Sequence, residues 1–167
     1  IHVGPLIRRE QNYRNDLMED RKRLFNALFN FARKLPVSYI CAKVKKSECA
    51  DVVELTSKLS KSISRILRDH AEYFESFDKI IVYYDNGQVE LTKILTTLFN
   101  ALLNNVEFRK VKPSDYKLFQ VADLVCTLEL LSEKAGTSSF THSEFEFFHS
   151  VRDFKKNYYK SISQKHI

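Results

Sequence analysis

Apolar residues recur every three or four positions in four long stretches of the chain, which predicts four helices. The first follows Asp16 and Glu19, which have capping-box spacing, and it ends at Pro36 because proline lacks the backbone N–H that a helix uses. Thr141 and Glu144 have the same spacing and predict an additional short helix. The first helix has its apolar stripe at Leu24, Leu28, Phe31 and Leu35, and the other long helices are expected over residues 51–74, 88–103 and 114–131.

Three shorter stretches are rich in β-branched and aromatic residues and predict strands. Residues 37–44 and 106–112 alternate between apolar and polar positions, whereas residues 80–84 are continuously apolar, as is typical of a buried strand. Because helices alternate with strands, we expect parallel strands joined by crossover helices. The pattern predicts a single α/β domain over residues 1–167, with a strand or loop ahead of the first helix.

The composition is that of a folded protein without membrane features. Hydrophobic residues make up 44% and charged residues 29% of the chain, and no apolar run approaches the roughly 20 residues that span a bilayer. No signal-peptide pattern opens the sequence, and the cysteines Cys41, Cys49 and Cys126 lack metal-ligand spacing. We therefore expect a soluble cytoplasmic protein with reduced thiols, with Cys126 in the core, and no membrane partner.

The formal net charge of +6 bears on the choice of partner. Such an excess favours phosphates and other acidic molecules, although a generic soluble surface can carry the same balance. Lys155 and Lys156 belong to a C-terminal tail that is rich in basic residues. Both lysines are candidate contacts for a nucleic-acid substrate.

Asp85 ends the predicted buried strand and is followed by Asn86 and Gly87. In open α/β sheets ligands gather at the carboxyl ends of strands, so a carboxylate at this position is placed for chemistry. The sequence Asp-Asn-Gly is also common turn chemistry, because glycine can adopt a positive φ. Asp85 is therefore either a site residue or a turn residue.

Asp123 lies inside the otherwise apolar helix predicted over residues 114–131. A buried carboxylate is strongly disfavoured unless it is paired, bound to a metal or directed at a cleft. Gln120 precedes it by three residues and shares its helix face, while an Arg or Lys partner would satisfy Asp123 equally well. Together Asp85 and Asp123 could hold Mg²⁺ or Mn²⁺, which would activate water for phosphodiester cleavage.

Other polar residues are weaker candidates. Asp115 is more typical of a helix start, and Glu90 is more typical of a solvated helix face. His2 with Arg8 and Arg9 could orient a phosphate, because guanidinium groups match phosphate geometry, but a basic run near a chain end is more often solvated.

Four segments of the chain carry a resemblance to a known family. They are His-Val-Gly-Pro-Leu-Ile-Arg-Arg-Glu at residues 2–10, Val-Tyr-Tyr-Asp-Asn-Gly-Gln at 82–88, Lys-Pro-Ser-Asp-Tyr-Lys-Leu-Phe-Gln-Val-Ala-Asp-Leu at 112–124 and Arg-Asp-Phe-Lys-Lys-Asn-Tyr at 152–158. The chain resembles the bacterial and phage domain-of-unknown-function family 3800 over nearly its whole length. The pairing of Asp-Asn-Gly with Gln-x-Ala-Asp is fairly specific to that family.

The resemblance implies an RNase H-like fold, a three-layer sheet flanked by helices. It also implies a first strand ending in Asp-Glu-Ser-Gly, which would supply the central carboxylate of a metal site completed by Asp85 and Asp123. The chain begins at Ile1 and does not contain that strand, so we expect the N-terminal strand to be missing and metal binding to be weak. The sheet would then have an exposed edge through which copies could associate.

Three functions are compatible with this reasoning. The leading one is metal-dependent cleavage of nucleic acid, with Mg²⁺ or Mn²⁺ as cofactor. The alternatives are a non-catalytic nucleic-acid-binding or phage-defence component and a structural, oligomer-forming protein. For the nuclease, Asp85 and Asp123 would bind the metal, and the residues expected to contact substrate are His2, Arg8, Arg9, Gln120, Lys155 and Lys156.

Overall fold

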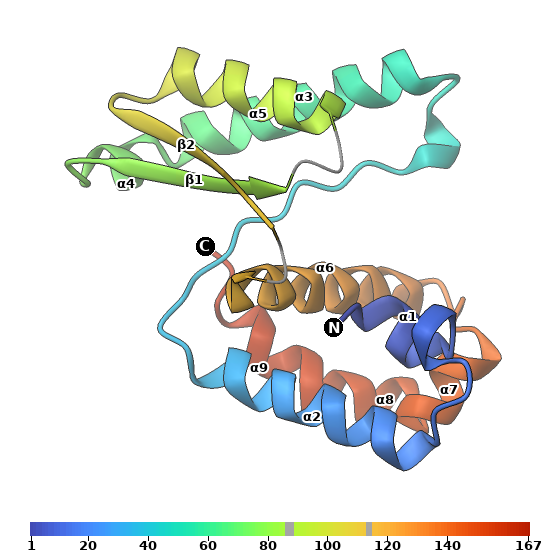
Figure 1. Ribbon diagram of the computed structural model, residues 1–167. Helices are drawn as coiled ribbons and strands as arrows, with labels where there is room; N and C mark the ends of the chain where they lie inside the picture. Colours follow the sequence, from blue (N-terminus) through green and yellow to red (C-terminus); the bar gives the residue numbers. More distant parts are fainter. Residues whose placement is uncertain (86–88, 113–114) are drawn as a thin grey trace. The chain divides into compact units, whose positions relative to one another are not determined.

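The structure is a computed structural model that describes residues 1–85, 89–112 and 115–167 (Figure 1). Helices make up 66% of the chain and strands 8%. The chain forms two compact units, one built from residues 1–39 and 116–167 and the other from residues 40–115. We call the first the helical unit and the second the mixed unit.

The helical unit is organised around two long helices, α2 (Met18–Lys34) and α6 (Lys117–Gly136), which pack together. The C-terminal helices lie alongside α2, where the Tyr158 hydroxyl donates to Asn26 Oδ1 at 3.3 Å (Figure 1). The shorter elements are α1 (Val3–Arg8), the 3-10 turn η1 (Gln11–Tyr13), α7 (His142–Phe148), α8 (Val151–Phe154), the π-helical turn η4 (Lys155–Tyr159) and α9 (Lys160–Ser163).

Aromatic rings form the centre of the core in the helical unit. The ring of Phe25 packs edge to face on Phe147, Phe148 and Tyr158, with centroid distances between 5.2 and 5.7 Å. Such pairs add about 0.5–1.5 kcal/mol each beyond the area they bury. This cluster joins α2 to the C-terminal helices, which are more than a hundred residues away in sequence.

Residues 3–8 form a helix in place of the predicted strand or loop. Pro5 is compatible with this because it lies in the first turn, where its missing N–H breaks no intrahelical bond. Val3 and Leu6 are completely buried, and α1 packs against both α6 and α7. A helix of six residues is too short to be stable by itself, so α1 depends on these tertiary contacts.

The mixed unit is a βαβ unit with an additional helix layer. β1 (Ile80–Asp85) and β2 (Val106–Val111) are parallel, and their register runs from Ile80–Val106 to Asp85–Val111. α5 (Val89–Leu102) lies between them in sequence and packs on β2 and on α3 (Val52–Asp69). The unit is completed by the 3-10 turn η2 (Lys46–Glu48) and by α4 (Ala71–Glu75).

This architecture corrects the predicted RNase H-like fold. Within the described residues the sheet has two strands, β1 and β2, and the chain is mostly helical, so it is not a three-layer sheet fold. The strand predicted at residues 37–44 is also wrong, because in the described chain this segment forms an isolated parallel bridge, between Tyr39 and His166, and not a strand. A strand needs a neighbouring strand for its backbone hydrogen bonds, and alternation in sequence does not supply one.

The start and the buried face of α2 also differ from the prediction. The helix begins at Met18, and its N-cap residue Leu17 makes no side-chain capping bond, so the Asp16–Glu19 capping box is wrong. Leu24 and Phe31 are 38% and 40% exposed, while the buried face is formed by Phe25, Leu28, Phe29 and Ala32. Apolar residues occur in adjacent pairs here, so two overlapping stripes fit the sequence and tertiary packing selects between them.

The remaining elements are confirmed to within a few residues. They are the strands at 80–84 and 106–112 and the helices at 51–74, 88–103 and 114–131, although the 51–74 helix is divided into α3 and α4. The Thr141–Glu144 capping box is present, with Thr141 Oγ1 accepting from Glu144 N at 3.3 Å. Gln88 and Ser114 lie outside the described residues.

Candidate functional site

Asp85 occupies the last position of β1, opposite Val111 of β2, as the sequence predicts. Its side chain lies outside the described part of the chain, as do Asn86, Gly87 and Gln88. Asp85 belongs to the mixed unit, whereas Asp123 belongs to the helical unit. A shared metal site formed by the two carboxylates therefore stays a prediction.

Asp123 is half-buried on α6, and its carboxylate binds the beginning of α1. Its Oδ2 accepts a hydrogen bond from the backbone N–H of Val3 at 2.7 Å. The first N–H groups of a helix have no partner within it and carry the positive end of the helix dipole, so a carboxylate is stabilising there. The sequence left open an Arg or Lys side chain as the partner of Asp123. The partner observed is the backbone N–H of Val3.

Arg21 of α2 holds the opposite end of α1. Its side chain is buried, and Nη1 donates to the carbonyl oxygens of Leu6 at 2.9 Å and Ile7 at 3.0 Å. Burial lowers the pKa of Arg21, and the nearby Arg9 lowers it further. The guanidinium nevertheless complements the negative end of the helix dipole. Arg21 was not predicted from the sequence, where its local signal is no more than a basic side chain early in an amphipathic helix.

The predicted phosphate-binding residues divide into two sets around α1. His2 immediately precedes Val3. The Arg8 guanidinium folds back over Gly4, so closely that a Cβ at this position would lie 3.3 Å from Arg8 Nη2. The Asp123 carboxylate and the Arg8 guanidinium therefore both lie against the first turn of α1, and Gln120 lies one turn before Asp123 on α6. The other member, Arg9, is at the far end of the helix.

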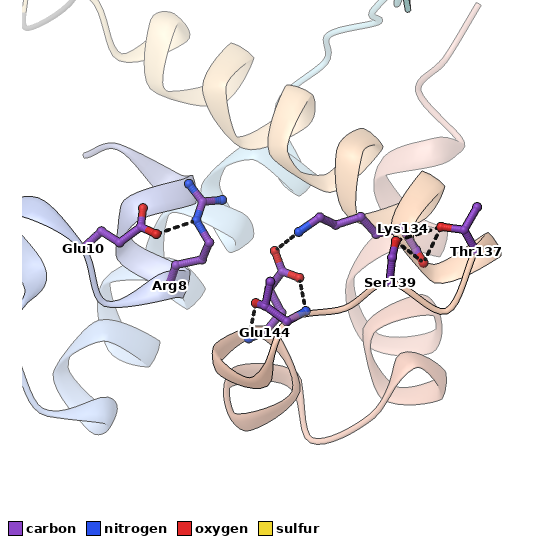
Figure 2. Close-up of polar contacts among 7 residues, drawn as sticks. Arg8, Glu10, Lys134, Thr137, Ser139 and Glu144 are labelled. Carbon is purple, nitrogen blue, oxygen red and sulfur yellow. Dashed lines mark hydrogen bonds and ion pairs between the residues drawn. The ribbon is translucent and has the colours of Figure 1, made fainter. Parts of the chain in front are cut away.

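Both arginines are engaged by neighbouring groups. Arg8 Nε forms an ion pair with Glu10 Oε1 at 3.1 Å (Figure 2). Arg9 has a φ of 61°, and its Nε donates to the carbonyl oxygen of Arg14 at 3.0 Å. These contacts hold the turn that leads from α1 to η1. They leave neither guanidinium in the unpaired state that a phosphate site would favour.

A buried ion pair connects α6 to α7. Lys134 Nζ lies 2.6 Å from Glu144 Oε1, and Glu144 Oε2 accepts from the Thr141 N–H at 2.8 Å (Figure 2). Burial alone would raise the pKa of Glu144, but the bonds from Lys134 and Thr141 hold it below its usual value. Glu144 is 1% exposed, so this charge supports the structure and is not available to a ligand.

The C-terminal helices present a row of exposed cations. We call this row the basic ridge and define it as Arg152, Lys155, Lys156 and Lys160, all of which are exposed. Arg152 lies three residues before Lys155 and four before Lys156, and Lys156 lies four before Lys160, so these pairs are neighbours on the helix surface. Within the described chain no ridge side chain forms an ion pair or a hydrogen bond, in contrast to the paired surface residues Arg23 and Lys58.

The one acidic residue within the ridge sequence is occupied by a capping interaction. Asp153 Oδ2 accepts from the Ser150 hydroxyl at 2.7 Å, and the Asp153 N–H donates to Ser150 Oγ at 3.0 Å. Ser150 is the N-cap of α8, so this pair fixes the start of the helix that carries the ridge. The ridge therefore keeps its positive charge at the surface.

Three further sequence predictions can be compared with the structure. Cys126 is exposed, so its assignment to the core is wrong. Asp115 is exposed and lies just before α6, whose first residue is Lys117. Glu90 is in α5, but its side chain lies outside the described part.

Neither a metal site nor a membrane segment is evident in the described residues. No group of three or more His, Cys, Asp or Glu side chains among them is placed to hold a metal ion. No helix among them is long and apolar enough to cross a membrane. Mg²⁺ or Mn²⁺ at Asp85 and Asp123 stays a prediction.

Comparisons with protein-family models, curated proteins and solved structures find no match to this chain. The resemblance to the domain-of-unknown-function family 3800 therefore stays a prediction.

Proposed function

We propose that this protein binds nucleic acid through its phosphate backbone and that the basic ridge makes the contacts. The observation that carries the proposal is the set of four adjacent, exposed and unpaired cations, Arg152, Lys155, Lys156 and Lys160, in the described C-terminal segment. Cations that already have carboxylate partners gain little from a phosphate. Cations without them release counterions from the nucleic acid when they bind, which drives association.

The distribution of charge supports the same proposal. Residues 1–39 and 116–167 contain 15 Lys and Arg against 10 Asp and Glu, so the helical unit holds five of the six excess positive charges. The buried carboxylate of Glu144 is paired with Lys134, so it does not neutralise the ridge cations. A positive potential of this kind steers polyanions to the surface before they make contact.

The salt dependence of binding follows from the number of ridge cations. With four phosphate contacts on a duplex, the slope of log Kobs against log salt is about −3.6, which weakens binding about 150-fold between about 50 and 200 mM salt. The double variant Lys155→Gln/Lys156→Gln removes two contacts. Its binding should weaken only about 12-fold over the same range.

Fluorescence anisotropy of a labelled oligonucleotide at several salt concentrations tests the proposal. The matched control is Lys45→Gln/Lys46→Gln, a second Lys-Lys pair that lies at η2 in the mixed unit and carries the same charge change. We expect the ridge variant to lower the slope by about 2 and the control to leave it unchanged. An equal loss in both variants would mean that net charge, and not the ridge, governs binding.

Metal-dependent cleavage is a second candidate function, and one observation favours it. Asp123 is half-buried at the beginning of α1, and one of its two carboxylate oxygens has a hydrogen-bond partner among the described residues. The other oxygen fits a hard divalent cation, which prefers carboxylate ligands. Bound metal would supply activated water, Asp123 would orient that metal, and His2 would contact the phosphate, since Arg8 is already paired with Glu10.

Cleavage is tested separately from binding. The protein is incubated with Mn²⁺ or Mg²⁺ and labelled DNA, RNA and hybrid substrates, together with Asp85→Asn and Asp123→Asn. Asparagine retains an acceptor for the Val3 N–H, so the fold at α1 should survive in the second variant. Cleavage that is lost in both variants supports a metal nuclease. Binding without cleavage supports a protein that binds nucleic acid through the basic ridge and does not cut it.

A further inference from the structure

The basic ridge offers positive charge but no aromatic ring on which a base could stack. Three aromatic residues lie within residues 150–163, and all of them pack inward. Phe154 is completely buried, Tyr158 packs edge to face on Phe29 at 5.0 Å, and Tyr159 stacks on Phe154 at 6.0 Å. The hydroxyl of Tyr159 also donates to the buried carboxylate of Glu129 at 3.3 Å.

The π-helical turn η4 explains how two consecutive tyrosines both reach the core. A π turn has i→i+5 hydrogen bonds and contains more residues than an α-helical turn. In η4 the three residues Lys155, Lys156 and Asn157 are exposed in succession, and both Tyr158 and Tyr159 then point inward. The turn therefore groups the lysines on the surface and removes the aromatic rings from it.

Single strands and duplexes make different demands on a protein surface. Proteins that bind single strands combine a basic groove with exposed aromatic rings, and each stacked base contributes about 1–3 kcal/mol. A duplex keeps its bases stacked inside and presents one charge per about 1.7 Å of axis, against about 3.4 Å for each strand. A surface that has charge and no rings gains more from the duplex.

From this difference we infer that the basic ridge binds the paired phosphate backbone of a duplex, without regard to sequence, in preference to unpaired strands. The inference rests on the proposed function and names its substrate class. Duplex DNA and duplex RNA share the chemistry that the ridge recognises. Because no base edge is read, replacing one mixed sequence by another should leave the affinity unchanged.

Anisotropy titrations of the full chain with four labelled probes test the inference. The probes are a DNA duplex, an RNA duplex, a polypyrimidine single strand and a second DNA duplex of scrambled sequence. At low salt we expect a duplex to bind at least about tenfold more tightly than the single strand, with a slope near −3.6. Both DNA duplexes should bind equally.

A gain-of-function variant makes the test independent of lost folding. Asn157 is exposed between the ridge lysines and the tyrosines, so Asn157→Tyr places a ring on the ridge. We expect single-strand affinity to rise by at least about fivefold, the smallest gain that one stacked base gives, with duplex affinity unchanged. Circular dichroism of the variant checks that the helices are retained.

The outcomes separate the inference from the proposed function. Single-strand binding as tight as duplex binding in the unmodified protein, with no gain from Asn157→Tyr, overturns the inference while the ridge remains a nucleic-acid site. Different affinities for the two DNA duplexes also overturn it, because they show that bases are read. Absence of binding to all four probes overturns the proposed function itself.

Discussion

Replacing Asp123 tests whether its carboxylate holds α1 in place. The Val3 N–H donates to Asp123 Oδ2 at 2.7 Å, and the Val3 residue is completely buried. Asp123→Leu leaves this N–H without an acceptor. Hydrogen bonds to charged groups contribute about 1.5–3 kcal/mol, so we expect the free energy of unfolding to fall by about 2–3 kcal/mol. Asp123→Asn keeps an acceptor oxygen and loses only the helix-dipole term, about 0.3–1 kcal/mol.

Urea denaturation followed by far-ultraviolet circular dichroism measures the loss. Hydrogen–deuterium exchange then locates it, because detachment of α1 should increase exchange at residues 3–8 before the rest of the helical unit opens. The matched control is Asp20→Leu, which removes an exposed carboxylate whose partner is Arg23 at 3.0 Å. Surface changes of this kind alter stability by about 0.5 kcal/mol or less.

The order of the two Asp123 variants decides between the roles of this residue. If Asp123 acts as a structural acceptor, Asp123→Leu must lower the free energy of unfolding clearly more than Asp123→Asn does. If Asp123→Leu unfolds at the same urea concentration as the unmodified protein, the reasoning is refuted. If both variants are equally stable but lose an Mn²⁺-induced stabilisation that the unmodified protein shows, the carboxylate acts as a metal ligand.

Three further predictions concern residues that support the helical unit. Arg21→Met should destabilise the protein by about 3–5 kcal/mol in urea denaturation, because two charge-assisted bonds to α1 are lost and the carbonyls of Leu6 and Ile7 remain buried. Arg21→Lys should recover part of that loss. The depressed pKa of Glu144 stabilises the folded state above the ordinary value of 4.5, and this contribution is lost as pH falls through the folded pKa. A pH series of urea denaturations should therefore show that the free energy of unfolding falls less steeply at acid pH in Glu144→Gln than in the unmodified protein. Ser150→Ala should lower the free energy of unfolding by about 1 kcal/mol, because it removes the α8 cap. It should also weaken oligonucleotide binding in anisotropy, because it frees the Asp153 carboxylate beside the ridge.

Elements that depend on neighbouring residues were predictable from the sequence. Residues 80–84 are a β-branched and aromatic run, and the helix after them has clear apolar spacing, so β1, α5 and β2 could all be located. The Thr141–Glu144 capping box was predictable because both partners lie within one helical turn. The signals that locate these elements lie within each element's own sequence, although β1 and β2 pair with each other across 26 residues.

Elements that depend on distant residues were not predictable. α1 contains Gly4 and Pro5, which suggest a loop, and its two ends are held by Arg21 and by Asp123, the latter 120 residues away. The strand expected at residues 37–44 does not form because no distant strand in the described chain pairs with it. Its alternation is suitable, but in the described chain its strand pairing is limited to the isolated bridge between Tyr39 and His166. The local sequence pattern does not show whether a distant segment will pack against an element or pair with it.

The candidate site shows the same division between local and distant causes. A basic C-terminal segment is visible in the sequence, and so is the pair Tyr158–Tyr159, which is more typical of helix packing or an interface than of stacking on bases. The π turn and the aromatic cluster around Phe25 and Phe148 decide that both tyrosines point inward. Within residues 150–163 the exposed side chains are therefore charged or polar and not aromatic, which is the basis of the preference for a duplex inferred above.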